Sequence, residues 1–297
     1  MHDQSRAREG SAEQPPPTFT RLLAESGPAE PTGVDLLPEG TEAAGGAPAA
    51  ADRPFVLVNM ASTADGRASI GGRSRAIGNR ADRALFHRLR GAVDAVLVGA
   101  GTVRAERYGR MIPDAASRER RRARGLSEEP LACVVSGRLS LPGDIPLLSE
   151  PAARVVLVTA SAESLPDCPA RIEYVRAGRD GEVDLALALR ELRERFSVRT
   201  LLCEGGPHLN WGLLRAGLAD ELRLTLAPKL AGGADGEGLR IIAGLEFAHP
   251  LELTLLEVLQ SDSYLFLRYR VPASAPESVS RETTLSSSLA RSRPSEA

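Results

Sequence analysis

Residues 200–217, with the sequence TLLCEGGPHLNWGLLRAG, say more about the fold than any other stretch of the chain. Four residues of an apolar run lead to Glu204 and two glycines, and a helical pattern then starts at Pro207 and ends at Gly217. Proline is favoured in the first turn of a helix, and glycine just beyond its end. The stretch therefore predicts a buried strand that turns into a helix, and ligands of α/β sheets bind at that edge.

Gly205 and Gly206 remove side chains at the predicted strand exit, so that a ligand can approach the backbone closely. The helix that follows directs free N–H groups and its positive dipole end at the same gap. This pattern predicts a seat for a phosphate or pyrophosphate, and a tight turn without a ligand is the alternative. The spacing is not G-x-G-x-x-G, so it does not indicate that dinucleotide fingerprint.

The rest of the chain predicts an α/β fold. Short runs that are apolar on both faces suit strands of a parallel sheet, and they occupy 55–61, 95–99, 131–135, 154–160 and 200–203. Helices are expected from Asn79 to a stop at Gly91, and from Asp184 onward. Residues 221–228, 251–259 and 264–271 indicate antiparallel strands, the last two as a hairpin. We expect a mixed, mainly parallel sheet of eight or nine strands with antiparallel C-terminal strands.

The composition divides the chain into three parts. Residues 1–52 are rich in Pro, Gly, Ala and Glu and are expected to form a disordered leader, in which the piece FTRLLAE can dock locally. Residues 53–272 are expected to form one domain. Residues 273–297 are expected to form a disordered tail.

Several classes of function are disfavoured. The formal net charge is −2, and the basic run 118–125 lacks aromatic residues and is flanked by acids, so a solvated helix face is favoured over nucleic-acid binding. No stretch is long and apolar enough for a membrane span or a signal peptide, which favours a cytoplasmic protein. The three cysteines form no C-x-x-C pair and the four histidines are scattered, so we expect no metal.

Two further strand exits resemble the first one. Gly99 and Gly101 precede Thr102, which can bind a phosphate or cap a helix. Ser136 and Arg138 follow the strand at 131–135, where an NAD site would usually present an acid to the ribose. An exit without an acid favours NADPH, although an ordinary loop is equally compatible. A long polar loop over 59–79 also suggests a functional role.

Three blocks carry a resemblance to a known family: STADGRAS…AIGN, VDAVLVGAGTVRAERYG, and LLCEGGPHLNWGLLRAGLADELRLTLAPKLAGG. They resemble the pyrimidine reductase of riboflavin biosynthesis over about residues 54–271. The resemblance implies a dihydrofolate reductase-like three-layer fold. It also implies an NADPH-dependent enzyme, often a homodimer, which reduces the ribosyl group of a phosphoribosylamino-pyrimidine to ribityl by hydride transfer to C1′.

The resemblance and the strand exits together give the candidate site. The catalytic candidate is Glu204. Candidate substrate-binding residues are Asp65, Ser74, Arg90 and Glu204, with the charge of Arg90 expected to be free for the ribose phosphate. Candidate cofactor-binding residues are Ala61, Ala76, Gly99, Gly101, Thr102, Val103, Glu106, Ser136, Arg138, Gly205, Gly206, Pro207, His208, Leu209 and Asn210.

The chain departs from the family pattern in places. Many relatives have Lys at the position of Asn59, and an acidic pair followed by Pro where this chain has AERYG. No deaminase pattern precedes the domain, so the chain resembles the stand-alone form, and a deaminated or an aminated pyrimidine is possible. One alternative is a dihydrofolate, dihydropterin or other small-molecule reductase, although the first helix offers only Asp82 as an acid. Another is an NADP(H)-binding protein without turnover.

Overall fold

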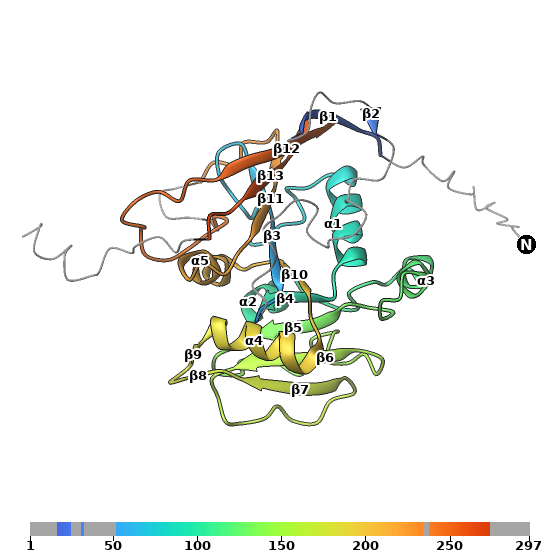
Figure 1. Ribbon diagram of the computed structural model, residues 1–297, viewed down its shortest axis with the longest axis vertical. Coiled ribbons are helices and arrows are strands. Elements are labelled where there is room, and N and C mark those ends of the chain that lie inside the picture. Colours follow the sequence, from blue (N-terminus) through green and yellow to red (C-terminus); the bar gives the residue numbers. More distant parts are fainter. Residues whose placement is uncertain (1–16, 25–30, 33–51, 234–237, 274–297) are drawn as a thin grey trace, which may run out of the picture.

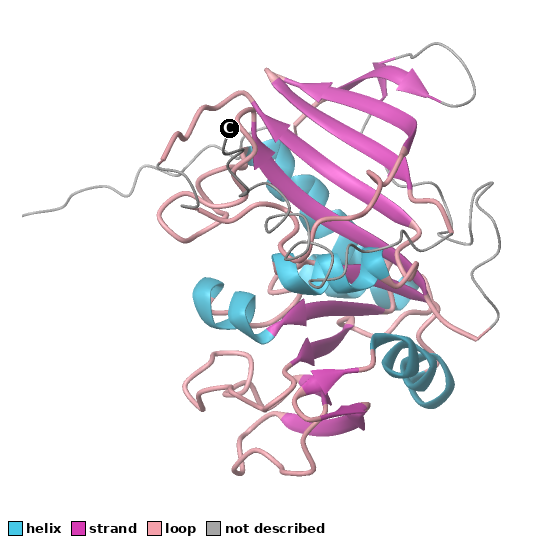
Figure 2. Ribbon diagram, turned by 90° about the vertical axis from the view of Figure 1, so that its left-hand side faces the viewer, coloured by secondary structure: helices cyan, strands magenta, loops and turns pink. Residues whose placement is uncertain are grey.

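The computed structural model describes residues 17–24, 31–32, 52–233 and 238–273, and within these ranges one sheet of eleven strands runs through the molecule (Figures 1 and 2). Its order is β2-β1-β12-β13-β11-β3-β10-β4-β5-β6-β7. The strands are β1 Phe19–Ala24, β2 Pro31–Thr32, β3 Phe55–Thr63, β4 Ala95–Gly99, β5 Leu131–Val135, β6 Arg154–Thr159, β7 Arg171–Arg176, β10 Thr200–Cys203, β11 Glu221–Ala227, β12 Thr254–Ser261 and β13 Tyr264–Arg270. A separate two-stranded ribbon contains β8 Gly178–Arg179 and β9 Glu182–Val183.

The sheet has a parallel half and an antiparallel half. Strands β3, β10, β4, β5, β6 and β7 are mutually parallel, and β11 also runs parallel to β3. Beyond β11, the strands β13, β12 and β1 pair in antiparallel fashion. The expected fold class is thereby confirmed, whereas the expected number of eight or nine strands is wrong, because the sheet has eleven within the described residues. The predicted strands at 95–99, 131–135 and 200–203 have the observed bounds, whereas β7 was missed.

Helices cover both faces of the sheet and give three layers (Figure 1). They are α1 Arg80–Ala92, α2 Ala100–Glu106, α3 Ala115–Ala123, α4 Leu185–Phe196 and α5 Pro207–Arg215. One core contains the buried residues of α1 and α2, and the other contains those of α4 and α5. The Asn79 side chain caps α1 by accepting a hydrogen bond of 2.9 Å from the backbone N–H of Asp82. The predicted stop at Gly91 is wrong by one residue, because the chain becomes extended only at Val93, where it enters β4.

Strand β1 comes from the segment that the composition assigned to the leader. It pairs with the edge strand β12, and the Phe19 side chain is buried against Phe266 with the ring centroids 5.3 Å apart. Arg21 Nε lies 2.8 Å from Glu257 Oε1. The sequence FTRLLA thus docks as a strand, which corrects the description of residues 1–52 as a disordered leader. The same leader also contains strand β2, which pairs with β1, whereas residues 1–16, 25–30 and 33–51 and the part of the expected tail 273–297 beyond residue 273 lie outside the described residues.

Candidate active site

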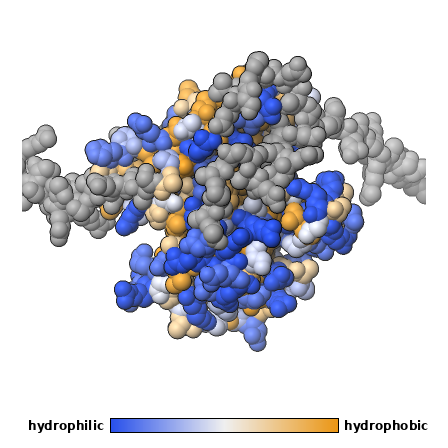
Figure 3. Space-filling view, viewed as in Figure 1, coloured by the Kyte–Doolittle hydropathy of each residue, from blue (hydrophilic) through white to orange (hydrophobic). Residues whose placement is uncertain are grey.

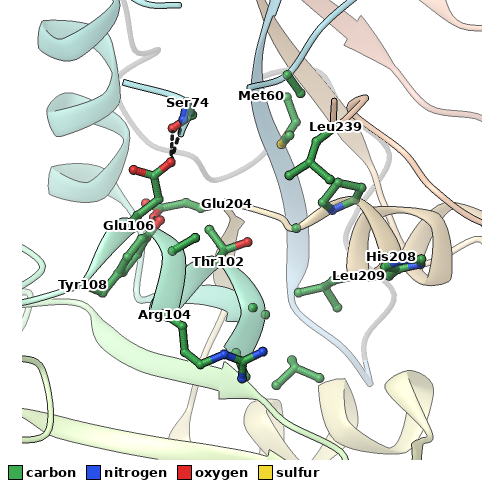
Figure 4. A pocket seen from close by; sticks show the side chains of 18 of the residues that line it. Met60, Ser74, Thr102, Arg104, Glu106, Tyr108, Glu204, His208, Leu209 and Leu239 are labelled. Atoms are coloured by element: carbon green, nitrogen blue, oxygen red, sulfur yellow. Dashed lines mark hydrogen bonds between the residues drawn. The ribbon is translucent and has the colours of Figure 1, made fainter. Parts of the chain in front are cut away.

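A cleft of about 1660 Å³ runs along the carboxyl ends of β3, β10, β4 and β5 (Figure 4). This is the edge at which open α/β sheets bind their ligands. The cleft is larger than the volume of roughly 300–1,000 Å³ that is typical for one small molecule. It therefore has room for a dinucleotide together with a second ligand.

The glycine-rich exits of β4 and β10 touch each other in the middle of the cleft. The backbone N–H of Gly99 donates to Gly205 O at 2.7 Å. A Cβ atom added to Gly99 would lie 3.3 Å from Gly206 N, and one added to Gly206 would lie 2.8 Å from Thr102 Oγ1. A side chain at Gly206 would fill the space in front of the N-terminus of α5. The bare backbone there forms a cradle that fits the diphosphate of a dinucleotide.

Glu204 stands at the end of β10 and is held by two other residues of the cleft. Arg90 donates two hydrogen bonds to the Glu204 carboxylate, from Nε to Oε1 at 2.7 Å and from Nη2 to Oε2 at 2.7 Å. The Tyr108 hydroxyl donates to the same Oε2 at 2.6 Å, and Figure 4 shows Tyr108 and Glu204 pointing toward each other. We call Arg90, Tyr108 and Glu204 the carboxylate cluster. Bidentate, charge-assisted contacts of this kind fix the orientation of a carboxylate.

The expectation that the charge of Arg90 is free is wrong. Arg90 is buried in the last turn of α1, and its third nitrogen, Nη1, donates to Met111 O at 3.0 Å. Its guanidinium also lies over the rings of Phe86 and Tyr108. Burial alone would lower the pKa of Arg90, but the charge and hydrogen bonds of Glu204 outweigh burial and raise this pKa. Arg90 therefore serves first as the counter-ion of Glu204.

Sequence reasoning missed Tyr108 as a site residue. Arg107, which ends α2 in the left-handed conformation with φ of 49°, turns the chain so that Tyr108 enters the cleft. Burial, and then the charge of Glu204, raises the pKa of the Tyr108 hydroxyl well above its usual value. The hydroxyl therefore stays protonated and donates its hydrogen to Glu204. The signal was present in AERYG, the block that departs from the family pattern.

The polar loop after β3 is tied down at three points. Lys229 Nζ donates to the carbonyl oxygens of Ala76 and Ile77 at 2.7 and 3.0 Å. Asp65 accepts from Thr63 Oγ1 and from the backbone N–H groups of residues 231 and 232, and these contacts lower its pKa to about 2. Glu106 Oε1 accepts from both the N–H and the hydroxyl of Ser74, at 2.7 and 2.9 Å (Figure 4). This last contact connects the loop to α2 across the cleft.

One face of α1 also lines the cleft. It presents Asp82, Arg83, Phe86, His87 and Arg90, which are spaced for one helix face. Burial raises the pKa of Asp82, and a hydrogen bond with Thr225 offsets only part of the increase. Burial and then the charge of Arg90 lower the pKa of His87. Asp82, the acid near the start of the first helix, therefore lines the cleft.

The structure brings most of the candidate residues together. Those that line the cleft are Ala61, Ser74, Arg90, Gly99, Gly101, Thr102, Glu106, Ser136, Glu204, Gly206, Pro207, His208 and Leu209. Those that do not line it are Asp65, Ala76, Val103, Arg138, Gly205 and Asn210.

The residues outside the cleft have other surroundings. Val103 lies in the core, and Asp65 is engaged by the loop at 231–232. The buried Asn210 side chain donates to Ile241 O at 2.7 Å. Arg138 packs against the β8–β9 turn, where its Nε lies 2.6 Å from the position of a Cβ on Gly181. Sequence spacing could not separate these side chains from those that face the ligand.

Within the described ranges, the residues include no group of three or more His, Cys, Asp or Glu side chains that could hold a metal ion. In the same part of the chain, no helix has both the length and the apolar character needed to cross a membrane.

Comparison with known proteins gives the family. The model of the RibD C-terminal domain matches residues 54–267. The chain is 32% identical over 222 residues to the 2,5-diamino-6-ribosylamino-4(3H)-pyrimidinone 5′-phosphate reductase of Methanothermobacter thermautotrophicus, covering 74% of this chain and 99% of that protein. It is 34% identical to the protein of the same name from Archaeoglobus fulgidus, covering 62% and 84% of the two chains.

Solved structures agree on the fold. A pyrimidine reductase-like protein from Corynebacterium diphtheriae superposes with a TM-score of 0.62 at 22% identity, over 74% of this chain and 92% of that one. A deaminase/5-amino-6-(5-phosphoribosylamino)uracil reductase from Thermotoga maritima gives a TM-score of 0.59 at 26% identity, over 74% and 57%. The dihydrofolate reductase-like fold is thereby confirmed, and the names of the relatives are those of oxidoreductases. The chain belongs to the RibD C-terminal domain family.

Proposed function

We propose that this chain reduces the ribosyl group of a 5-phosphoribosylamino-pyrimidine to ribityl, by hydride transfer from NADPH to C1′, in the cytoplasm. One observation carries the proposal. A carboxylate fixed by Arg90 and Tyr108 lies beside a bare glycine cradle in a single cleft, in a chain whose curated relatives are named for this reduction. We assign the activity to the expected domain over residues 53–272.

The cofactor proposal rests on the cradle at Gly99 and Gly206. NADPH supplies the hydride, and the chain's own residues position it and exclude water. The start of α5 has no side-chain cap and Thr102 Oγ1 lies beside Gly206, so we expect the N-terminus of α5 and the Thr102 hydroxyl to contact the diphosphate. Glu204 stands next to the cradle, where it can accept hydrogen bonds from the pyrimidine or the ribose.

The substrate phosphate needs a seat other than Arg90, whose nitrogens are committed to Glu204 and Met111. The loop contributes Ser74 and Arg75 to the cleft, and α1 contributes Arg83 and His87. We propose that these groups hold the 5′-phosphate. Arg83 is exposed on the face of α1 that lines the cleft, so its guanidinium can turn toward an anion there.

The test is NADPH oxidation with a panel of substrates. We expect turnover with a phosphoribosylamino-pyrimidine and none with dihydrofolate. Turnover with dihydrofolate alone would support a dihydropterin-type reductase, for which Asp82 in the cleft is the relevant acid. Binding of NADPH without turnover on any substrate would support a binding protein.

The panel must contain both pyrimidine forms. The archaeal relatives are named for the 2,5-diamino compound, whereas the name of the Thermotoga maritima protein includes the uracil. We propose the diamino compound as the substrate, because these two relatives are matched over most of their length. A higher kcat/KM for the uracil form would reverse this choice.

We further propose a homodimer through the outer face of the antiparallel strands. In β11 the face toward α1 contains Glu221, Arg223 and Thr225, while the opposite face contains leucines. The opposite face continues in register through half-exposed Leu267 and Val258, and Leu255 on this part of the sheet is also exposed. In the view of Figure 3, hydrophobic side chains gather in the upper part, over these strands. A leucine face of this kind is suited to a second copy.

The oligomer is tested by analytical ultracentrifugation of the wild type and of Leu267→Lys. We expect a dimer for the wild type and a monomer for the variant. A monomeric wild type at micromolar concentration would contradict the proposal.

We also propose that catalysis needs no metal, because hydride transfer is the chemistry of the cofactor. Activity that a chelator abolishes and zinc restores would contradict this.

A further inference from the structure

The cofactor end of the cleft contains a cation whose role is not explained by the carboxylate cluster. Arg104 extends from α2 into the cleft and is exposed (Figure 4). Its Nη1 donates to Ser140 O at 2.6 Å, and its Nη2 lies 4.0 Å from the position of a Cβ on Gly101. The guanidinium therefore spans from the start of α2 to the loop after β5.

The order of the strands sets the direction of a dinucleotide in the cleft. Glu204 follows β10, Gly99 ends β4 and Ser136 follows β5, and these three strands are consecutive neighbours in the sheet. Strand exits are spaced by about 4.8 Å. If the reactive ring lies beside Glu204 and the diphosphate lies at the Gly99–Gly206 contact, the adenosine must lie toward Ser136. Arg104 lines this half of the cleft together with Ser136, Gly137 and Ser140.

Other charged groups at this end are less suitable for binding an anion. Arg138, which the sequence suggested, packs against Gly181 and does not line the cleft. Arg215 lines the cleft from the last turn of α5, with its guanidinium over the Trp211 ring. Glu182 also lines the cleft, and an acid would oppose an additional phosphate. Arg104, by contrast, both lines the cleft and donates a hydrogen bond to the loop after β5.

We propose that Arg104 selects NADPH over NADH by binding the 2′-phosphate of the adenosine ribose, with the hydroxyls of Ser136 and Ser140 beside it. This inference rests on the proposed function and adds the residue that determines cofactor specificity. A planar guanidinium can bind a phosphate with two N–H groups. One of its five N–H groups is used for Ser140 O, so enough donors remain for the phosphate.

The test uses nucleotide fragments and needs no turnover. Adenosine 2′,5′-bisphosphate and adenosine 5′-monophosphate are titrated into the wild type, Arg104→Gln, Arg104→Lys and Arg138→Gln by isothermal calorimetry. For the wild type we expect the bisphosphate to bind about tenfold more tightly or better, as is typical for one charge-assisted contact. Arg104→Gln should remove most of this ratio without weakening the monophosphate, and Arg104→Lys should restore part of it. Arg138→Gln should leave the ratio unchanged.

Three results would overturn the assignment. An unchanged ratio in Arg104→Gln would exclude Arg104, and a ratio lost in Arg138→Gln would identify Arg138 instead. Equal binding of both fragments by the wild type would show that no 2′-phosphate is recognised. NADPH oxidation by the wild type is measured in parallel. If the wild type oxidises NADPH but the binding ratio does not depend on Arg104, this inference fails while the proposed function stands.

Discussion

The two ends of the cleft differ in what they present to a ligand: one presents paired, buried charged side chains, and the other presents glycine backbone without side chains. At the proposed substrate end, the carboxylate cluster buries charged groups that are already paired with one another. At the proposed cofactor end, Gly99 and Gly206 leave bare backbone with no side chain to pair with. This difference indicates that the proposed substrate end contributes to the stability of the fold, whereas the proposed cofactor end is open because its glycines have no side chains. Substitutions should therefore change stability and catalysis together at the first end, and binding alone at the second.

The largest effect is expected for Arg90→Met. This substitution leaves Glu204 buried without its counter-ion, which typically costs about 3–5 kcal/mol. Urea denaturation should show that loss in the free energy of unfolding, together with a strongly reduced kcat/KM. The double variant Arg90→Met/Glu204→Gln should recover part of the stability but not the activity. If Arg90→Met only raises KM and leaves stability within about 0.5 kcal/mol, the charge of Arg90 is free after all.

Gly206→Ala should weaken NADPH binding with little change in stability. The new methyl group would lie 2.8 Å from Thr102 Oγ1, in the space proposed for the diphosphate. A methyl group that occupies space needed by the ligand should weaken binding by about 1–3 kcal/mol, which corresponds to roughly 5- to 150-fold in the dissociation constant. Fluorescence titration with NADPH and thermal melting measure the two quantities. Gly91→Ala is the matched control, because a Cβ at Gly91 in α1 meets nothing within 4 Å. Unchanged NADPH affinity in Gly206→Ala would show that the cradle is not the cofactor seat.

Tyr108→Phe tests a hydrogen bond within the carboxylate cluster, the one that Tyr108 donates to Glu204. The ring remains in place, but Glu204 loses one donor, at a cost of about 1.5 kcal/mol for a bond to a charged group. We expect kcat/KM to fall about tenfold, with the dissociation constant of NADPH unchanged. Steady-state kinetics and the NADPH titration measure both. A loss of NADPH affinity that equals the loss of kcat/KM would assign Tyr108 to the cofactor end.

The smallest effect is expected for Asp82→Asn. Burial raises the pKa of Asp82, so the folded state binds a proton there more readily than the unfolded chain. The stability from this group is therefore complete below the ordinary carboxyl pKa and is lost as the pH rises through the raised value. At pH 7 the variant should be more stable by less than about 1 kcal/mol. Its stability should also fall less than that of the wild type as the pH rises through this range.

Asp65→Asn is the control of opposite sign. The pKa of Asp65 is lowered to about 2, so its contribution is present above the ordinary carboxyl pKa and is lost as the pH falls toward 2. Melting curves recorded between pH 2 and pH 7 test both variants. The same direction of change in both would contradict the burial of Asp82.

The parallel half of the fold could be predicted from the sequence because its strands are buried on both faces. Runs such as 95–99 and 131–135 are uniformly apolar, and their bounds were correct to the residue. Strand β7 contains charged residues and is an edge strand, so it lacked that signal. Strand β1 is a short amphipathic piece within a polar, proline-rich region, and its burial depends on Phe266, 247 positions away in the chain.

The site was predictable where the residue type itself determines the backbone conformation. Glycine and proline at 205–207 indicate a turn and a helix start whatever surrounds them, and most of this stretch lines the cleft. Pairings between side chains were not predictable. The ion pair of Arg90 and Glu204 joins residues 114 positions apart. No local spacing in the sequence indicates that these two charges pair with each other. Tyr108 was missed for the same reason.

Lys229 gives the molecule an unexpected handle for chemical labelling. It is the single lysine in this sequence, among 37 basic residues, and its ammonium group donates to the carbonyl oxygens of the loop beside the cleft. An amine-selective acylating reagent therefore has one side-chain target, which reacts only after the amine leaves those carbonyl oxygens. The rate of acylation at Lys229, followed by mass spectrometry of one peptide, would report how often the loop opens, without any engineered probe.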